Sequence, residues 1–430
     1  MDFDDILYYY ALLLEKDDFY LQETRKKFKY VLIDESQDMN LIQYEIISKL
    51  SKESKLLMLV GDIDQCIYTF RGSNYNLINR FKDEWNAKLI VLEENYRCTK
   101  TILEAANNLI DNNIDRINKK LYTNNETSFE NIYRGFRTQA EESNFVSNLI
   151  NRLISLGYEY KDIAILYRNN MLANNFEKDF ISKKIPYKVY GSMPFFNHKE
   201  IKSILNHYRF LFNHRDSIAL SMIINYPTKR ISDSELSDLN RLSESSGKPL
   251  YEVIKSDAKY SGLLQEVENL ISAYKELDKL AFFDYMINSS GLIKEIAKEK
   301  GSKEKLARVY EFRNYIEELP EDNGNSLIDL VNDVYLQNTK EVDGENVSMM
   351  TIHQAKGLEF KVVILVGCNQ GILPSLKSND PNDEEERRLF YVAITRARER
   401  LFLLSSQRRF LNGKQQYFAP SDFLLEIKMF

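Results

Sequence analysis

Short apolar runs alternate along much of the chain with segments of helical periodicity. The runs are rich in Leu or β-branched residues, and most of them end at Gly, Asp, Glu or Asn, which is typical of buried parallel strands. They cover residues 30–33, 56–60, 89–92, 163–167, 347–352, 362–366 and 401–404. Amphipathic helical patterns occupy residues 41–50, 99–113 and 141–156. This alternation predicts an α/β fold built from doubly wound parallel sheets.

The middle of the chain has a different pattern. Residues 199–338 have an almost entirely helical periodicity, interrupted by Pro227, Pro249 and Pro320. Asp233, ahead of Ser-Glu-Leu, is a plausible helix start. Because the α/β pattern resumes near Val347, we predict a helical domain inserted into an α/β domain.

Composition narrows the class only slightly. The chain has 430 residues, 43% of them hydrophobic, and its net charge of -6 neither requires nor excludes nucleic acid. No apolar run approaches the roughly 20 residues of a membrane span, and carboxylates stand where a signal peptide would have basic residues. We therefore expect a soluble, cytoplasmic protein without a membrane partner. Cys66, Cys98 and Cys368 lack metal-ligand spacing, and we expect buried thiols rather than a disulfide framework or a zinc site.

Two acids follow the first apolar run directly. Ligands of open α/β sheets bind beyond the carboxyl ends of strands. Asp34 is placed to hold Mg²⁺ there, and Glu35 to accept a proton from an attacking water. A solvated turn after a strand is the alternative interpretation of such a pair.

The run 56–60 leads into a second polar block, residues 61–72. Gln65 lies just past the strand end, where it is placed to contact a γ-phosphate. Tyr68, Phe70 and Arg71 follow, a combination that stacks on single-stranded bases in many proteins. Alternatively, Tyr68 and Phe70 belong to the hydrophobic core.

These segments together resemble the UvrD/Rep/PcrA-type superfamily 1 DNA helicases over essentially the whole chain. The match rests on Asp34-Glu-Ser-Gln-Asp38, Gly61–Gly72, Leu92-Glu-Glu-Asn-Tyr-Arg97, Thr351–Phe360 and Glu384–Arg396, preceded by Asp2-Phe-Asp-Asp5. Phe70 stands where this family usually has Trp, which preserves a stacking face but loses area and the indole donor.

The resemblance implies a role for each matched residue. Asp34 and Glu35 would hold Mg²⁺ and activate water, and Gln65 would contact the γ-phosphate of ATP. Tyr96 would stack on adenine and Glu359 would hydrogen-bond the ribose. Arg97 and Arg396 would neutralise the γ-phosphate, as arginine fingers do. His353 would join Tyr68, Phe70 and Arg71 on the DNA.

The other basic residues and the remaining histidines are interpreted as non-catalytic. Arg387, Arg388, Arg398 and Arg400 are predicted to form a solvated helix face with local salt bridges. Lys356 would either touch DNA phosphate or be a surface lysine. His198, His207 and His214 are interpreted as structural.

The resemblance also implies a division into domains. Residues 1–97 would form part of a first RecA-like domain, and residues 98–198 and 341–430 a second one. Residues 199–340 would form the inserted helical domain. The phosphate-binding loop GxxxxGK[ST], whose backbone N–H groups cradle phosphates, is missing from the sequence. Gly247-Lys248 and Gly413-Lys414 lack the rest of the pattern.

Two functions follow as expectations. The first is an ATP-dependent 3′-to-5′ DNA helicase acting on single-stranded or 3′-tailed DNA, truncated or split and inactive alone, whose P-loop segment another chain supplies. The second is a non-catalytic single-stranded DNA-binding or scaffold module derived from a helicase. Neither a nuclease nor a nucleotide-binding regulator has a supporting motif.

Overall fold

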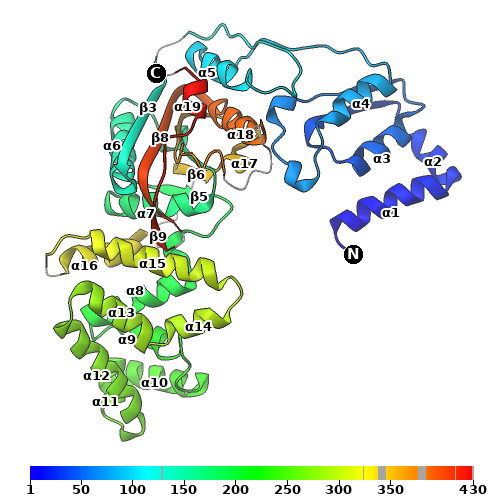
Figure 1. Cartoon of the computed structure of the whole chain (residues 1–430). Helices are drawn as coiled ribbons and strands as arrows, with labels where there is room; N and C mark the ends of the chain where they lie inside the picture. Colours follow the sequence, from blue (N-terminus) through cyan, green and yellow to red (C-terminus); the bar gives the residue numbers. More distant parts are fainter. Residues whose placement is uncertain (127–128, 323, 338–344, 376–383, 412, 429–430) are drawn as a thin grey trace. The chain divides into compact units, whose positions relative to one another are not determined.

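The computed structural model describes residues 1–126, 129–322, 324–337, 345–375, 384–411 and 413–428. The chain divides into two compact units. Unit 1 comprises Met1–Arg134, Thr351–Ser405 and Ala419–Phe430, and unit 2 comprises Gly135–Met350 and Ser406–Phe418. Figure 1 shows the elements coloured along the chain.

Unit 1 contains the segments that matched the helicase motifs. Its helices and strands are α1 (Phe3–Lys16), α2 (Asp18–Arg25), β1 (Tyr30–Ile33), α3 (Leu41–Ser51), β2 (Leu56–Leu59), α4 (Asn76–Glu84), α5 (Lys100–Ile110), α17 (Ile352–Ala355), β7 (Phe360–Leu365), α18 (Glu384–Ile394) and α19 (Phe423–Glu426). Three short 3-10 helices carry loop residues of the motifs: η1 (Ser36–Asp38), η2 (Ile63–Gln65) and η3 (Thr69–Arg71).

Strands β1 and β2 form a parallel two-stranded sheet in which Tyr30 lies opposite Leu56. Side chains alternate between its two faces. On one face Ile33, Leu57 and Leu59 pack with residues of α3 and α4 in a small core. On the other face the apolar side chains are exposed: Tyr30 by 63%, Leu32 by 65%, Leu56 by 45% and Met58 by 46%. One whole face of this sheet is therefore apolar and uncovered in the structure.

The other sheet has seven strands. Their order is β3-β8-β7-β4-β6-β5, with β9 paired to β8. The remaining strands are β3 (Ile132–Thr138), β4 (Ile163–Tyr167), β5 (Tyr187–Val189), β6 (Val347–Thr351), β8 (Ala397–Leu411) and β9 (Lys414–Tyr417). Pairs β7–β8 and β5–β6 are parallel, whereas β8–β9 is an antiparallel hairpin. Strand β4 is completely buried, as its continuous apolar run predicts.

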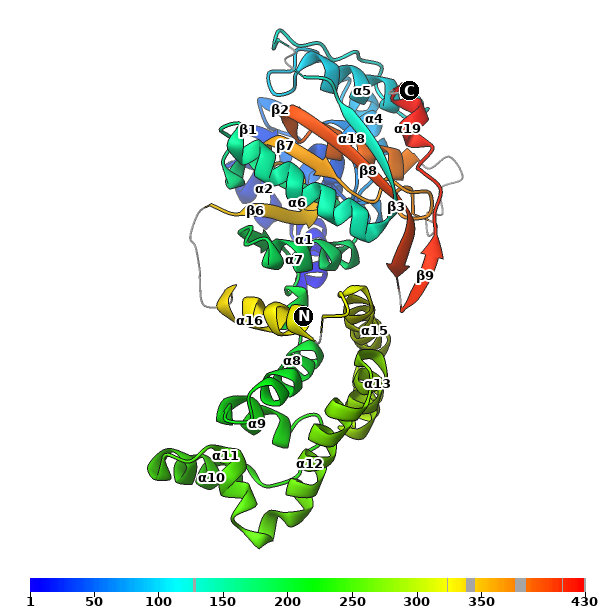
Figure 2. The same cartoon turned by 90° about the vertical axis from the view of Figure 1, so that its left-hand side faces the viewer.

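Unit 2 combines part of this sheet with many helices. Its helices begin with α6 (Gln139–Ser155), and Figure 2 shows the helices from α8 to α16 following one another. These elements are α7 (Ala173–Ser182), α8 (Lys199–Phe212), α9 (Ser217–Ile224), α10 (Asp233–Ser246), α11 (Leu250–Lys255), α12 (Ser261–Glu276), α13 (Lys279–Ser289), α14 (Leu292–Lys298), α15 (Ser302–Glu318) and α16 (Asn325–Gln337). Two large apolar clusters hold α8–α16 together.

Most of the expected elements are confirmed. Six of the seven apolar runs form or overlap strands, and within 199–322 and 324–337 the described residues contain no strand. Helix α10 begins at Asp233, with Ser232 as its N-cap. The three cysteines are buried free thiols. Among the described residues, no helix combines the length and apolar character that crossing a membrane requires.

The expectation for residues 89–92 was wrong, because this run is not a strand. Its side chains are exposed, Leu92 by 78% and Ile90 by 67%. A strand needs a neighbour to bond its backbone groups, and no described strand pairs with this segment. The run therefore has the composition of a buried strand without the surroundings of one.

Candidate functional site

The paired carboxylates follow β1 in an uncommon backbone conformation. Glu35 has φ 49° and ψ 39°, in the left-handed region that non-glycine residues rarely adopt. Its amide N–H donates to Asp34 Oδ1 (2.9 Å), and Gln37 Nε2 donates to Glu35 Oε2 (2.5 Å). Both carboxylates are exposed at the strand end. Backbone strain of this kind concentrates at functional sites, and here it places both acids at the end of the strand.

The two strand ends are tied together by a glycine and a glutamine. A Cβ on Gly61 would overlap the side-chain oxygens of Gln37 and Ser36, so glycine permits this approach without displacing them. That oxygen accepts a hydrogen bond from Asp62 N (2.9 Å). The loop after β2 is thereby fixed beside the carboxylates that follow β1.

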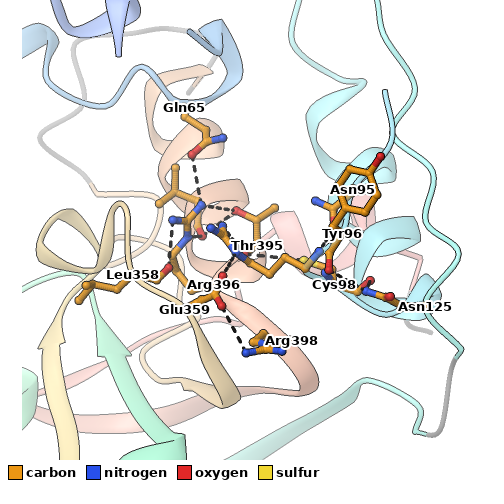
Figure 3. A network of polar contacts seen from close by, with 12 residues as sticks. Gln65, Asn95, Tyr96, Cys98, Asn125, Leu358, Glu359, Thr395, Arg396 and Arg398 are labelled. Carbon is orange, nitrogen blue, oxygen red and sulfur yellow. Dashed lines mark hydrogen bonds and ion pairs between the residues drawn. The ribbon is translucent and has the colours of Figure 1, made fainter. Parts of the chain in front are cut away.

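Gln65, at the end of η2, is bound on three sides. Its Nε2 donates to Asp62 Oδ2 (2.9 Å). Its Oε1 accepts from Arg396 Nη2 (3.2 Å), the contact drawn in Figure 3. Its backbone oxygen accepts from Lys356 Nζ (2.9 Å). Three of the motif blocks therefore meet at this one glutamine.

Arg396 is the most enclosed cation of the site, with 2% of its surface exposed. Its Nε donates to Val392 O (3.1 Å) and its Nη1 to Leu358 O (3.2 Å), which fixes the plane of the guanidinium. Burial, followed by repulsion from Arg97, lowers the pKa of Arg396 to about 10. The group is still a cation at neutral pH, and its solvation is supplied by carbonyl oxygens.

Arg97 and Glu359 form an ion pair. Arg97 Nε donates to Glu359 Oε2 (2.7 Å), and Arg398 Nη1 donates to Glu359 Oε1 (3.3 Å). The hydrogen bond from Arg97 lowers the pKa of the Glu359 carboxyl below its usual value. Arg97 is paired with Glu359 in this structure, so a phosphate could bind Arg97 only by displacing that carboxylate.

Tyr96 leaves its ring open to solvent. The side chain is 78% exposed, and its hydroxyl donates to Glu94 Oε2 (2.8 Å). This bond is the main cause of a raised pKa of the Tyr96 hydroxyl. An aromatic ring that is anchored at its hydroxyl and exposed on its faces is suited to stacking on a planar base.

The four residues predicted to contact DNA lie together. The Tyr68 hydroxyl donates to the backbone oxygen of His353 (2.9 Å), and the Phe70 and His353 rings lie 5.6 Å apart, edge to face. The Arg71 guanidinium lies 5.2 Å from the Tyr68 ring centroid and 5.5 Å from that of Phe70. Phe70 is 65% exposed. The cluster is therefore a partly open aromatic and cationic surface. It is not part of the hydrophobic core, which was the alternative interpretation of Tyr68 and Phe70.

Two predictions for basic residues are corrected by the structure. Lys356 is not a surface lysine: its side chain is 8% exposed, and its Nζ binds Asp38 Oδ2 (2.5 Å) and lies 3.8 Å from Glu35 Oε2. Arg387 and Arg388 are buried rather than solvated, because Glu426 and Glu384 neutralise them inside the fold. The salt bridges were expected, but their burial was not.

Several residues of the site were missed in the sequence. Asp38 and Asp62 bind Lys356 and Gln65, and Lys119 and Arg116 neutralise Asp62 and Asp64. Asp64 is 1% exposed. The available signal was the Asp-x-Asp pattern at the start of the block 61–72, since buried acids need cations nearby.

The site fits one end of a magnesium nucleotide. In nucleotide sites Mg²⁺ takes one or two protein carboxylates and completes its shell with water and phosphate oxygens. Asp34 and Glu35 are exposed carboxylates of this kind, and within the described ranges no cluster of three or more His, Cys, Asp or Glu forms an all-protein cage. Gln65, Arg97 and Arg396 suit a terminal phosphate, whereas the sequence offers no GxxxxGK[ST] loop for the inner phosphates.

The fold and the order of the motifs point to the UvrD-like helicases, and the chain belongs to this family. Residues 1–86 match the UvrD/REP helicase N-terminal domain, and residues 90–408 match the UvrD-like helicase C-terminal domain. The resemblance drawn from the motifs is thereby confirmed.

Three relatives show how much of such a protein the chain represents. It is 35% identical to the ATP-dependent DNA helicase Rep of Buchnera aphidicola, with 99% of this chain and 69% of that protein aligned. It is also 35% identical to DNA helicase II of Haemophilus influenzae and to the ATP-dependent DNA helicase PcrA of Staphylococcus aureus. In both comparisons 99% of this chain is covered, but the chain spans only 62% of the relative.

Proposed function

We propose that these residues are the greater part of an ATP-dependent 3′-to-5′ DNA helicase and that they are inactive alone. The observation that carries the proposal is the hydrogen bond between Gln65 Oε1 and Arg396 Nη2 (3.2 Å). It joins the loop after β2 to the residues that follow α18, so residues of both family domains meet, which supports a γ-phosphate position at this point. The direction of movement and a role in DNA repair are inferred from the family.

The proposed architecture has two RecA-like domains. Residues 1–97 are part of the first, and residues 98–198 and 341–430 form the second, with the helical residues 199–340 inserted into it. The two-stranded β1–β2 sheet supports an incomplete first domain, and the helices from α8 to α16 support the insertion.

Each side chain contributes one part of the chemistry. Bound Mg-ATP would supply the phosphoryl group and the metal charge. Asp34 would hold the metal, and Glu35 would accept the proton of the attacking water. Arg97 and Arg396 would neutralise charge on the γ-phosphate. Glu359, once released from Arg97, would be free to accept a hydrogen bond from the ribose, and Tyr96 would stack on adenine.

The residues proposed to contact DNA begin at Tyr68, three positions after Gln65. Tyr68 and Phe70 would stack on bases of a single strand, with Arg71 and His353 beside them. Because Tyr68 is bonded to His353 and lies under the Lys356 ammonium (5.2 Å), this surface is directly connected to Asp38 and Gln65. A change at the nucleotide therefore has a short path of contacts to the DNA.

The uncovered face of β1–β2 supports a further polypeptide segment in the working motor. Its exposed apolar residues, together with the unpaired run 89–92, are a surface that folded proteins cover. We propose that a segment carrying the P-loop packs there, either on the same polypeptide or as a separate chain.

The test is single-stranded DNA affinity with and without Mg-ATP, measured with the P-loop segment of a relative supplied in front of Met1. A helicase motor predicts an affinity shift that disappears in Arg396→Lys and persists in the exposed control Arg241→Lys. DNA binding that is indifferent to Mg-ATP would favour the alternative, a non-catalytic DNA-binding or scaffold module.

A further inference from the structure

The orientation of the Gln65 amide is set by unlike partners at its two ends. Its Nε2 faces the Asp62 carboxylate (2.9 Å), and its Oε1 faces the Arg396 guanidinium (3.2 Å). The opposite orientation would place an oxygen against a carboxylate and an NH₂ group against a guanidinium. Since a carboxylate only accepts and a guanidinium only donates, one amide orientation satisfies both partners.

A second acid lies beside Asp62. Asp64 N donates to Asp62 Oδ1 (3.0 Å), and the Asp64 side chain is 1% exposed. Burial, followed by repulsion from Asp62, raises the pKa of the Asp64 carboxyl. Two carboxyls this close require cations beside them.

The compensating charge comes from a segment outside all the motif blocks. Lys119 Nζ forms a short ion pair with Asp62 Oδ1 and lies 3.3 Å from Asp64 Oδ2. Arg116 Nη2 donates to Asp64 Oδ2 (3.1 Å) and to the backbone oxygen of Lys119 (3.3 Å). The side chains of Lys119 and Arg116 are 12% and 9% exposed, so water screens them little.

We propose that Lys119, supported by Arg116, is a positioning residue that fixes the Gln65 amide through Asp62. The order of contacts is Lys119, Asp62, Gln65, Arg396. Lys119 holds one oxygen of Asp62, the other Asp62 oxygen accepts from the Gln65 NH₂ group, and the amide oxygen faces Arg396. The functional meaning rests on the proposed role of Gln65 at the γ-phosphate, but the positioning itself is a property of residues 1–430.

Two substitutions of Lys119, one of Asp62 and a control substitution of Lys120 test this order of contacts. Lys119→Arg keeps the charge and Lys119→Met removes it, whereas Lys120→Met removes the charge of the exposed neighbour. In Asp62→Asn the new amide would turn its oxygen toward the Lys119 ammonium and its NH₂ toward Gln65. That arrangement would favour the reversed orientation of the Gln65 amide without changing the size of residue 62.

The experiment is NMR of the Gln65 side-chain NH₂ in the full chain labelled with ¹⁵N-glutamine, assigned with Gln65→Glu. In Lys119→Met and Asp62→Asn we expect the Gln65 signals to move and their hydrogen exchange to accelerate at least about tenfold, the factor that corresponds to ~1.4 kcal/mol. Lys119→Arg should retain the parent signals, and Lys120→Met should leave them unchanged.

Unaltered Gln65 signals in a folded Lys119→Met protein would overturn the proposal, with the other glutamine signals reporting folding. If Lys119→Met does not fold, Asp62→Asn decides, and parent-like Gln65 signals there would equally overturn it. Because this readout needs no nucleotide, its failure would leave the helicase function standing, and loss of nucleotide binding would leave the positioning intact.

Discussion

At the scale of single residues, Phe70 is the clearest departure from the family pattern. It is exposed and sits in edge-to-face contact with His353, so its ring can receive a base. Stacking of one base on an aromatic side chain contributes about 1–3 kcal/mol. Phe70→Ala should therefore weaken single-stranded DNA binding by roughly 5-fold to 150-fold, and Phe70→Trp should strengthen it.

Fluorescence anisotropy with a labelled oligonucleotide checks this expectation. Phe19→Ala is the matched control, because Phe19 is 77% exposed on α2 and has no part in the aromatic cluster. Equal affinities for Phe70→Ala and the parent chain would remove Phe70 from the DNA surface.

At the scale of elements, α7 and α15 each bury a carboxylic acid. Glu177 accepts hydrogen bonds from Phe195 N (3.0 Å) and the Tyr187 hydroxyl (3.0 Å). Glu311 accepts them from Asn174 Nδ2 (2.8 Å) and the Tyr315 hydroxyl (3.2 Å). Burial raises the pKa of Glu177 to about 7 and that of Glu311 to about 8.

These raised values predict a stability that falls with rising pH. An unfolded Glu loses its proton near pH ~4.3, while the folded chain holds these protons up to about pH 7 and 8. Between those limits the folded state binds more protons, so the free energy of unfolding decreases as pH increases. Glu311→Gln cannot ionise and should flatten this dependence between pH 5 and 8.

Thermal melts across that pH range provide the measurement. Glu317→Gln, which alters a 58% exposed acid on the same helix, should keep the slope of the parent chain. Superimposable pH profiles for Glu311→Gln and the parent would show that burial does not hold the Glu311 proton.

The elements also show what the sequence could and could not predict. The periodicity and composition of the sequence were sufficient to predict β4 and α10. Strand β4 is completely buried, and helix α10 begins at a local N-cap, Ser232. They failed for 89–92, because an apolar run becomes a strand only beside another strand. Hairpin strand β9, with the polar sequence Lys-Gln-Gln-Tyr, has no apolar pattern to detect. At the site, motif spacing gave Gln65 and Arg396, but the roles of Lys356 and Lys119 depend on long-range ion pairs that spacing does not encode.

At the scale of the molecule, the uncovered β1–β2 face is the largest consequence of the proposed missing segment. We expect Leu32→Glu with Met58→Glu to reduce self-association with little effect on the melting temperature, because both side chains are exposed. Leu57→Glu, one residue away and facing the small core, should instead unfold this part of the chain. Analytical ultracentrifugation and melting curves distinguish these outcomes, and strong destabilisation by the double variant would contradict an uncovered face.

The same surface should receive the P-loop segment. The proposed incomplete first domain would account both for its apolar character and for the GxxxxGK[ST] loop that this sequence lacks. The Leu32→Glu, Met58→Glu variant should therefore also fail to bind a separately supplied segment.

Steady-state ATP hydrolysis in the presence of single-stranded DNA tests this account most directly, measured for residues 1–430 alone and again with a P-loop segment supplied. We predict negligible hydrolysis by the chain alone and DNA-stimulated hydrolysis in the completed protein, abolished by Glu35→Gln. Robust hydrolysis by residues 1–430 alone, or none after completion with any relative's segment, would contradict it.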